Sequence, residues 1–331
     1  MIPRIASGIV WSLAWLIAAG FSAWATGAVF YDLPWPVLRR GAAGFMVLTF
    51  AAALIFLRGK WRKLAALHVL CGLVLAWWLT LQPSNHLAWQ ADVARTAHAE
   101  IAGDVVTLHN VRNCDYRTET DYIARWETRT VRLSQLTGID MAINYWGSPW
   151  MAHPIVSFQF ADTPPVCFSI ETRKEAGESY SAIGGIYRQY ELIYVVAEER
   201  DAIRVRTNFR KGEEVYLYHL NITPEKARTR FMDYLAALNE LHVRPRWYNA
   251  VTTNCTTSIR TQHDAAHRAA WDWRILVNGK GDELMFERGN IVTAGLPFED
   301  LKKRALINPA ANAANDAPDF SRRIRDGRPG F

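Results

Sequence analysis

The stretch Trp247-Tyr248-Asn249-Ala250-Val251-Thr252-Thr253-Asn254-Cys255-Thr256-Thr257-Ser258-Ile259-Arg260 contains the most informative feature of this chain, a cysteine at an expected helix start. A polar loop ends at Asn254, a favourable N-cap residue, and an amphipathic segment follows, so we expect Cys255 in the first turn of a helix. There, unpaired backbone N–H groups and the positive end of the helix dipole favour a thiolate over a thiol. Cys255 is therefore the candidate nucleophile of a cysteine enzyme.

His153 is the best placed histidine to act as the base that a catalytic cysteine needs. It begins an apolar segment, residues 155–160, that we expect to form a strand. A histidine at the start of a strand, facing a cysteine at the start of a helix, would form a thiol–imidazole pair. The alternative is a structural histidine beside a strand.

Glu171 is the candidate third residue, which would orient the imidazole. Residues 161–165 form an expected turn, and residues 166–171 return as the hairpin partner of residues 155–160. Alternation along the two strands puts Glu171 on the same face as His153 and near it across the hairpin. In the alternative interpretation, Glu171 belongs to a solvated charge run that continues through Glu175.

Three apolar segments in the N-terminal region are candidates to cross a bilayer. Residues 5–31, 41–57 and 64–81 carry no Asp, Glu, Lys or Arg, and about 20 apolar residues are needed for one span. The short loop between the second and third segments contains Arg58, Lys60, Arg62 and Lys63. The positive-inside rule places this loop in the cytoplasm, so the third span leads the chain to the extracytoplasmic side.

We therefore expect a three-span transmembrane anchor at residues 1–82 and an extracytoplasmic domain at residues 83–331, beginning with a helical linker at residues 83–108. The 331 residues carry a net charge of +6 and have a pI near 9.2, which suits contact with anionic lipid head groups. The positive charge would also be compatible with binding to nucleic acid. The sequence contains no RNA- or DNA-binding motif, however, so we expect no nucleic-acid partner.

The extracytoplasmic region mixes strand and helix patterns. Besides the hairpin, strands are expected at residues 128–133, 191–197, 202–207 and 214–222. A helix is expected from Pro224 to about Leu241, with Thr223 as its cap. Residues 319–325 are expected to dock as a final helix. The expected fold class is α+β, a three-helix anchor followed by an antiparallel sheet packed against helices.

The remaining cysteines and histidines leave alternatives open. The extracytoplasmic side is usually oxidising, so Cys114 and Cys167 could form a disulfide, and a disulfide at Cys255 would exclude catalysis. His263 and His267 are four residues apart, as metal ligands on one helix face can be, but surface placement is the simpler interpretation. The sequence contains no Cys-x-x-Cys pair, and we expect no metal site and no cofactor.

Three segments of the chain resemble a known bacterial envelope family. The run from Tyr248 to Arg260, the segment Trp150-Met151-Ala152-His153 and the closing residues 319–329 are similar to proteins with the Lnb N-terminal periplasmic domain. The similarity covers roughly residues 110–331, and the family's usual Gly-His pair is Ala152-His153 here. This resemblance implies a circularly permuted papain-like thiol fold, in which the histidine precedes the cysteine, and it implies lipoprotein N-acylation as the activity.

On this resemblance, Cys255 would attack an ester carbonyl of a phospholipid and form a thioester, and the acyl chain would pass to the N-terminal amine of a bacterial lipoprotein. His153 would take the thiol proton and later assist the amine, while the backbone N–H of Cys255 would help to hold the oxyanion. The expected substrate-binding residues are Trp150, Trp247, Tyr248 and Asn254. The aromatic residues among them could instead belong to the core.

The expected location is the bacterial inner (cytoplasmic) membrane, with a multi-pass anchor and a periplasmic C-terminal domain. The expected partners are the membrane, a phospholipid acyl donor and a lipoprotein acceptor. One alternative is a papain-like amidase or peptidase that cleaves peptidoglycan, which would have a groove lined by polar and charged groups. The other is a non-catalytic envelope assembly factor, whose function would survive the replacement Cys255→Ala.

Overall fold

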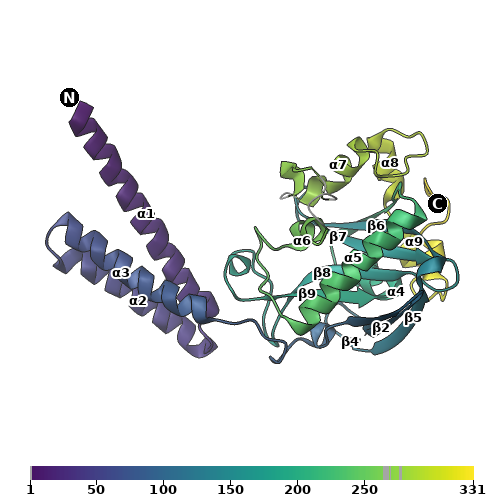
Figure 1. Cartoon of the computed structure of the whole chain (residues 1–331), viewed down its shortest axis with the longest axis horizontal. Helices are drawn as coiled ribbons and strands as arrows, with labels where there is room; N and C mark the ends of the chain where they lie inside the picture. The colour runs from purple at the N-terminus through teal and green to yellow at the C-terminus, as the bar shows by residue number, and fades with distance from the viewer. Residues whose placement is uncertain (1, 264–267, 269, 276–277) are drawn as a thin grey trace. The chain divides into compact units, whose positions relative to one another are not determined.

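The computed structural model of the chain describes residues 2–263, 268, 270–275 and 278–331 (Figure 1). The chain divides into two compact units. The first consists of residues 1–84, 180–190 and 247–250, and the second consists of residues 85–179, 191–246 and 251–331. Three apolar helices at the N-terminus are followed by a mixed sheet packed with helices, which confirms the α+β fold class.

The first unit is built on three long helices. They are α1 (Ile2–Asp32), α2 (Pro36–Phe56) and α3 (Lys60–Thr80). Within the described residues, all three are long and apolar enough to cross a membrane, as the sequence predicts. Two later segments complete this unit, since Tyr187 stacks on Tyr31 at 5.1 Å between ring centroids and Arg188 donates to the backbone oxygens of Trp78 and Leu81.

The second unit is built on one sheet, to which eight strands of the described chain contribute. The strand order is β1-β2-β9-β8-β7-β6-β10, and β5 pairs with β2. The strands are β1 (His98–Ala102), β2 (Val105–Arg112), β5 (Trp126–Arg132), β6 (Leu136–Trp146), β7 (Ala152–Phe160), β8 (Val166–Arg173), β9 (Glu191–Ala197) and β10 (Glu213–His219). Their pairing is antiparallel except between β2 and β9, where Arg112 pairs with Ala197 in parallel. Separately, β3 (Asp115–Tyr116) and β4 (Tyr122–Ile123) form a small ribbon.

Helices cover both faces of the sheet. On one face, Phe231 and Tyr234 of α5 (Pro224–Val243) pack edge-on against Phe158 and Phe168. On the other face, α4 (Glu199–Ala202), α9 (Asn308–Ala313) and α10 (Phe320–Arg323) share a buried apolar cluster with Ile155 and its neighbours. The remaining helices are α6 (Cys255–Thr261), α7 (Gly281–Glu287) and α8 (Phe298–Ala305). Alternating side chains along each strand supply both cores.

Most expected elements are confirmed. The strand predictions at 128–133, 155–160, 166–171, 191–197 and 214–222 correspond to β5, β7, β8, β9 and β10. Helix α5 begins at Pro224, and the Thr223 side chain accepts a hydrogen bond from the backbone of Lys226 at its N-terminus. The final helix is present as α10.

The predicted helical linker at residues 83–108 is wrong. This region contains β1 and β2, joined by a turn in which Gly103 adopts a φ of 62°. Its alanine content suggests a helix, but Ala99 lies at the sheet edge, where its backbone N–H and C=O both bond to the side chain of Asn239 on α5. A tertiary contact from α5, which local sequence does not reveal, therefore stabilises the strand.

The predicted strand at residues 202–207 is also wrong. The chain forms α4 and then a short π-helix, Val205–Phe209. Alternating Ile203, Val205 and Thr207 suggests a strand, but the intervening Arg204 and Arg206 are buried rather than solvated. The proposed disulfide between Cys114 and Cys167 is absent, because all four cysteines of the chain are described and all are free.

Candidate active site

Cys255 occupies the first position of α6, as the sequence predicts. The Asn254 side chain accepts a hydrogen bond from the backbone N–H of Thr257 at 2.9 Å, and the Thr257 hydroxyl accepts one from the backbone N–H of Asn254 at 2.9 Å. This reciprocal capping box fixes where the helix starts. It also leaves the N–H of Cys255 pointing out of the helix end without an intrahelical acceptor. Cys255 is 7% exposed, and its thiol takes part in no disulfide.

His153 lies near the start of β7 and interacts with Cys255. His153 is 8% exposed, and its hydrogen bond with the Cys255 side chain is one of the interactions that favour the protonated form of the imidazole. The other side of the ring contacts β8, where Nε2 lies 2.7 Å from the Ser169 hydroxyl and 3.3 Å from a Glu171 carboxylate oxygen. We therefore assign the remaining nitrogen, Nδ1, to the thiol.

Glu171 is held between His153 and two other side chains. The Ser169 hydroxyl donates to Glu171 Oε1 at 2.6 Å, and Arg206 on the π-helix donates to the same oxygen. Burial raises the pKa of Glu171, but the His153 imidazole and the Arg206 guanidinium outweigh burial and hold this pKa well below its usual value. Glu171 is therefore a carboxylate, and its contact with the imidazole fits the predicted orienting role rather than a solvated charge run.

The carboxylate changes the ionisation of His153 in turn. Burial lowers the pKa of the imidazole, but the charge of Glu171 and the hydrogen bonds with Cys255 and Glu171 reverse this effect and raise the pKa to about 9. An imidazole that keeps its proton at neutral pH is the partner that stabilises a thiolate. The three predicted residues thus form one connected group, Cys255–His153–Glu171.

Asn278 is a site residue that the sequence interpretation missed. Its side-chain N–H donates to Cys255 Sγ at 3.2 Å. Its amide oxygen is buried without a hydrogen-bond partner in the described part of the chain. Asn278 is 23 residues beyond Cys255, next to no motif, so only the tertiary fold reveals it. With the outward N–H of Cys255, it supplies a second donor beside the sulfur, which is the requirement for an oxyanion hole.

The backbone contacts of Gly279 hold the neighbouring Asn278 beside the Cys255 sulfur. Its N–H donates to the backbone oxygen of Trp150 at 3.1 Å, and its own oxygen accepts from the Tyr145 hydroxyl at 3.1 Å. A Cβ at this position would lie 2.3 Å from the backbone oxygen of Pro149. The glycine therefore permits a close backbone contact between the Asn278 segment and the segment that leads into His153.

The predicted substrate-binding residues differ in their exposure to solvent and in the compact unit to which they belong. Trp150 is 51% exposed, and its ring lies 6.4 Å from that of Trp273, which is 54% exposed. Asn254 is buried and caps α6, so the structure gives it a structural role. Trp247 and Tyr248 belong to the first unit, and their contact with substrate stays a prediction. Of the histidine pair 263/267, His263 bonds to Asp233 at 2.6 Å, and His267 lies outside the described residues.

A family comparison matches the segment of the chain that contains these residues. Residues 122–279 match the model of the Lnb N-terminal periplasmic domain. The protein carries an Lnb N-terminal periplasmic domain. The matched Lnb segment includes His153, Glu171, Cys255 and Asn278, and it begins and ends within the second unit. No curated protein and no solved structure matches the chain.

The family match and the anchor together define the general nature of the protein. Along the chain, the matched periplasmic domain follows three helices that are long and apolar enough to cross a membrane. The protein is therefore a membrane-anchored protein with a periplasmic domain of the Lnb type.

Proposed function

We propose that this protein is a cysteine-dependent acyltransferase of the bacterial inner membrane, which moves an acyl chain from a phospholipid to the N-terminal amine of a lipoprotein. The proposal rests chiefly on one observation, the grouping of Cys255, His153 and Glu171 with an amide donor, Asn278, at the sulfur. Nucleophile, base, orienting carboxylate and oxyanion donor are the four parts that acyl transfer through a thioester requires. The Lnb family match supports the choice of acceptor.

In the first half of the reaction, the Cys255 thiolate attacks the ester carbonyl carbon of the phospholipid. The C=O electrons move onto oxygen, and the N–H groups of Cys255 and Asn278 stabilise the resulting oxyanion. When the tetrahedral intermediate collapses, the ester C–O bond breaks and the His153 imidazolium gives its proton to the leaving alkoxide. The products are a thioester at Cys255 and a lysophospholipid.

In the second half, the neutral His153 takes a proton from the attacking amine of the acceptor while the new C–N bond forms. The same oxyanion donors act on the second tetrahedral intermediate. Collapse then breaks the C–S bond and restores the thiolate–imidazolium pair. Glu171 remains ionised throughout, since Arg206 and the imidazole stabilise its charge, and it keeps the ring oriented toward the sulfur.

Two features favour a lipid substrate over a peptide. Trp150 and Trp273 form an exposed aromatic pair on the segments that lead into His153 and toward Asn278. Large exposed aromatic side chains suit contact with acyl chains and with the membrane interface. The three apolar helices confine the enzyme to the membrane where both substrates would lie, and this confinement raises the rate of encounter.

The direct test uses the full-length protein in vesicles whose phospholipid carries a radiolabelled acyl chain. We expect label on Cys255 that hydroxylamine releases, and no label in the Cys255→Ser variant. In cells, mass spectrometry of lipoprotein N-termini should show acylated amines with the wild-type protein and free amines with Cys255→Ser. Absence of label, together with unchanged N-termini, would favour a peptidoglycan hydrolase or an assembly factor.

A further inference from the structure

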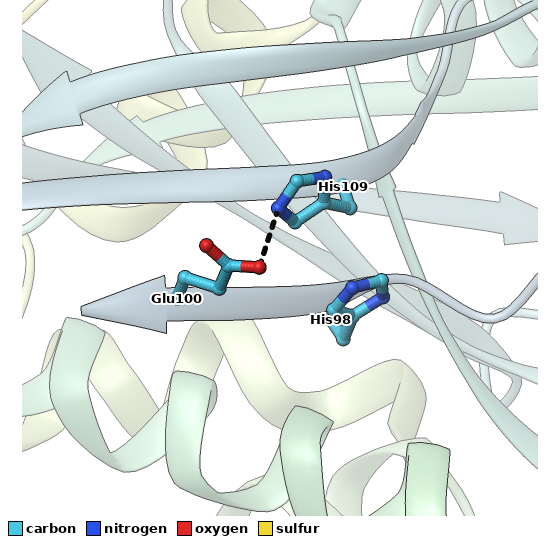
Figure 2. A group of neighbouring side chains, drawn as sticks. All are labelled: His98, Glu100 and His109. Atoms are coloured by element: carbon cyan, nitrogen blue, oxygen red, sulfur yellow. Dashed lines mark ion pairs between the residues drawn. The ribbon is translucent and has the colours of Figure 1, made fainter.

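A group of histidine and glutamate side chains lies at one edge of the sheet in the second unit (Figure 2). His98 and Glu100 are two residues apart on β1, so their side chains point to the same face of the sheet. His109 on β2 pairs directly with His98 in the antiparallel register. Figure 2 shows the three side chains turned toward one another from the two adjacent strands.

The donor atoms of these side chains are close together, and two of the ring nitrogens make no hydrogen bond in the described residues. One ligand atom from each of His98, Glu100 and His109 lies within 4.8 Å of the others, and His109 Nε2 is 3.3 Å from Glu100 Oε1. His98 Nδ1 and His109 Nε2 are buried without a hydrogen bond in the described part of the chain. A buried nitrogen that is not hydrogen-bonded destabilises the fold, so these two atoms need an explanation.

The surroundings keep the rings in place. The His98 and His109 rings stack at 4.6 Å between centroids, and His242 near the end of α5 stacks on His98 at 4.4 Å. The His242 ring is itself held by the Thr96 hydroxyl, 2.7 Å from Nδ1.

We propose that His98, Glu100 and His109 form a binding site for a divalent first-row transition-metal ion, with Zn²⁺ as the best-fitting ion. Two imidazoles and one carboxylate are a donor set that Zn²⁺ favours. Bonds of about 2.0–2.2 Å in a tetrahedral site place ligand atoms roughly 3.3–3.6 Å apart. The present separations, at most 4.8 Å, are larger than that value, so binding requires the side chains to rotate toward one another.

A water molecule would supply the fourth ligand of the ion, and the bound ion would stabilise the edge of the sheet. The Glu100 side chain is 74% exposed, so water reaches the group from that side. A bound ion would cross-link β1 to β2 at the edge where Asn239 of α5 holds the Ala99 backbone. It would also bond to ring nitrogens that make no hydrogen bond in the described residues. This role is independent of the acyl-transfer reaction, because none of the three ligands belongs to the Cys255 group.

The test is a Zn²⁺ titration of the full-length protein in detergent by isothermal calorimetry. All titrations use the Cys255→Ser background, so that the thiol at the candidate active site does not bind the ion. We expect one tight site, weakened at least tenfold by Glu100→Gln and abolished by His109→Ala. The matched control His86→Ala, which removes a histidine outside the group, should bind like the parent.

Two further measurements make the result decisive. Circular dichroism without metal checks that each variant is folded. Co²⁺ in place of Zn²⁺ should give the visible absorption of a tetrahedral site in the parent and lose it in His98→Ala. The proposal is overturned if the parent takes up no Zn²⁺, or if Glu100→Gln, His98→Ala and His109→Ala all bind as tightly as the parent, since the ion would then lie elsewhere.

Discussion

His153 and Glu171 face each other across the β7–β8 hairpin, with 3.3 Å between Nε2 and Oε1. The antiparallel register pairs Ile155 with Ser169, and a step of two residues along each strand brings the imidazole opposite the carboxylate. The pairing of two strands therefore sets the contact that governs the charge of the candidate base. A shift of one residue in this register would turn one of the two side chains to the other face of the sheet.

The first prediction concerns Glu171→Gln. Removing the carboxylate removes the chief interaction that raises the pKa of His153 to about 9, and burial then lowers this pKa. At pH 7 the imidazole becomes neutral, and Cys255 loses a neighbouring cation that would favour attack by its sulfur. We expect alkylation of Cys255 by iodoacetamide at pH 7 to slow by about tenfold or more, since one pKa unit corresponds to a factor of ten.

The pH profile supplies the check. Above about pH 9 the wild-type His153 also loses its proton, so the two alkylation rates should converge there. Glu119→Gln is the control, because that carboxylate is half exposed and pairs only with Arg210 among the contacts described. Parallel profiles for wild type and Glu171→Gln across this pH range would show that the carboxylate does not set the charge of His153.

Local pattern is sufficient to predict part of this site. Alternation along β7 and β8 places His153 and Glu171 on one face, because a hairpin with a short turn has few possible registers. Asn254 before an amphipathic run predicts the start of α6, because a cap is a local hydrogen bond between neighbours in sequence. The Cys255 assignment depends on that cap.

The other members of the site depend on long-range packing. Arg206 reaches Glu171 from a π-helix in a segment whose alternation resembles a strand, and Asn278 reaches Cys255 from a short 3-10 helix, Asn278–Lys280. Neither residue is part of a pattern with a fixed period. Strand β6 is also difficult to predict from local sequence. It is buried on both faces for most of its length, so it lacks the alternation of a half-buried strand.

The second prediction concerns Asn278→Ala. If its N–H group stabilises the oxyanion, the replacement should lower kcat about 10²–10³-fold with little change in KM. The measurement is the single-turnover rate of label transfer to Cys255 from vesicle phospholipid. Asn278→Gln is the companion variant, because it keeps the donor on a longer arm and should retain part of the rate. Equal rates for wild type and Asn278→Ala would exclude this role.

The third prediction separates Gly279 from Gly281. A Cβ on Gly279 would meet the backbone oxygen of Pro149 at 2.3 Å and the carbonyl carbon of Trp150 at 2.4 Å. Gly279→Ala should therefore push the Asn278 segment away from the sulfur and cost at least as much activity as Asn278→Ala. Gly281→Ala is the matched control, because nothing lies within 4 Å of its Cβ position. The label-transfer assay should distinguish the two, and similar rates would contradict the close-contact argument.

The last prediction concerns the C-terminal segment, where Arg325 binds two buried carboxylates. Its guanidinium donates to Asp140 at 2.6 Å and to Glu199 at 2.8 Å, and both carboxylates are at most 1% exposed. Arg325→Met leaves both charges buried without this cation, and loss of one partner of a buried ion pair costs about 3–5 kcal/mol. We expect a clear fall in the thermal unfolding temperature of the full-length protein in detergent.

The pH dependence of the loss of stability in Arg325→Met identifies the cause of that loss. Burial raises the pKa of Glu199, but Arg325 outweighs burial and lowers it, so this pair stabilises the fold above the unfolded-state pKa and less so as pH falls. The difference between wild type and Arg325→Met should therefore shrink in acid, where Glu199 is protonated in the variant. Arg323→Met is the control, because that exposed side chain pairs only with the half-exposed Asp319 among the described contacts and should change stability by less than about 0.5 kcal/mol. A difference between wild type and Arg325→Met that stays constant with pH would point to lost packing of the C-terminal segment rather than to the unpaired carboxylates.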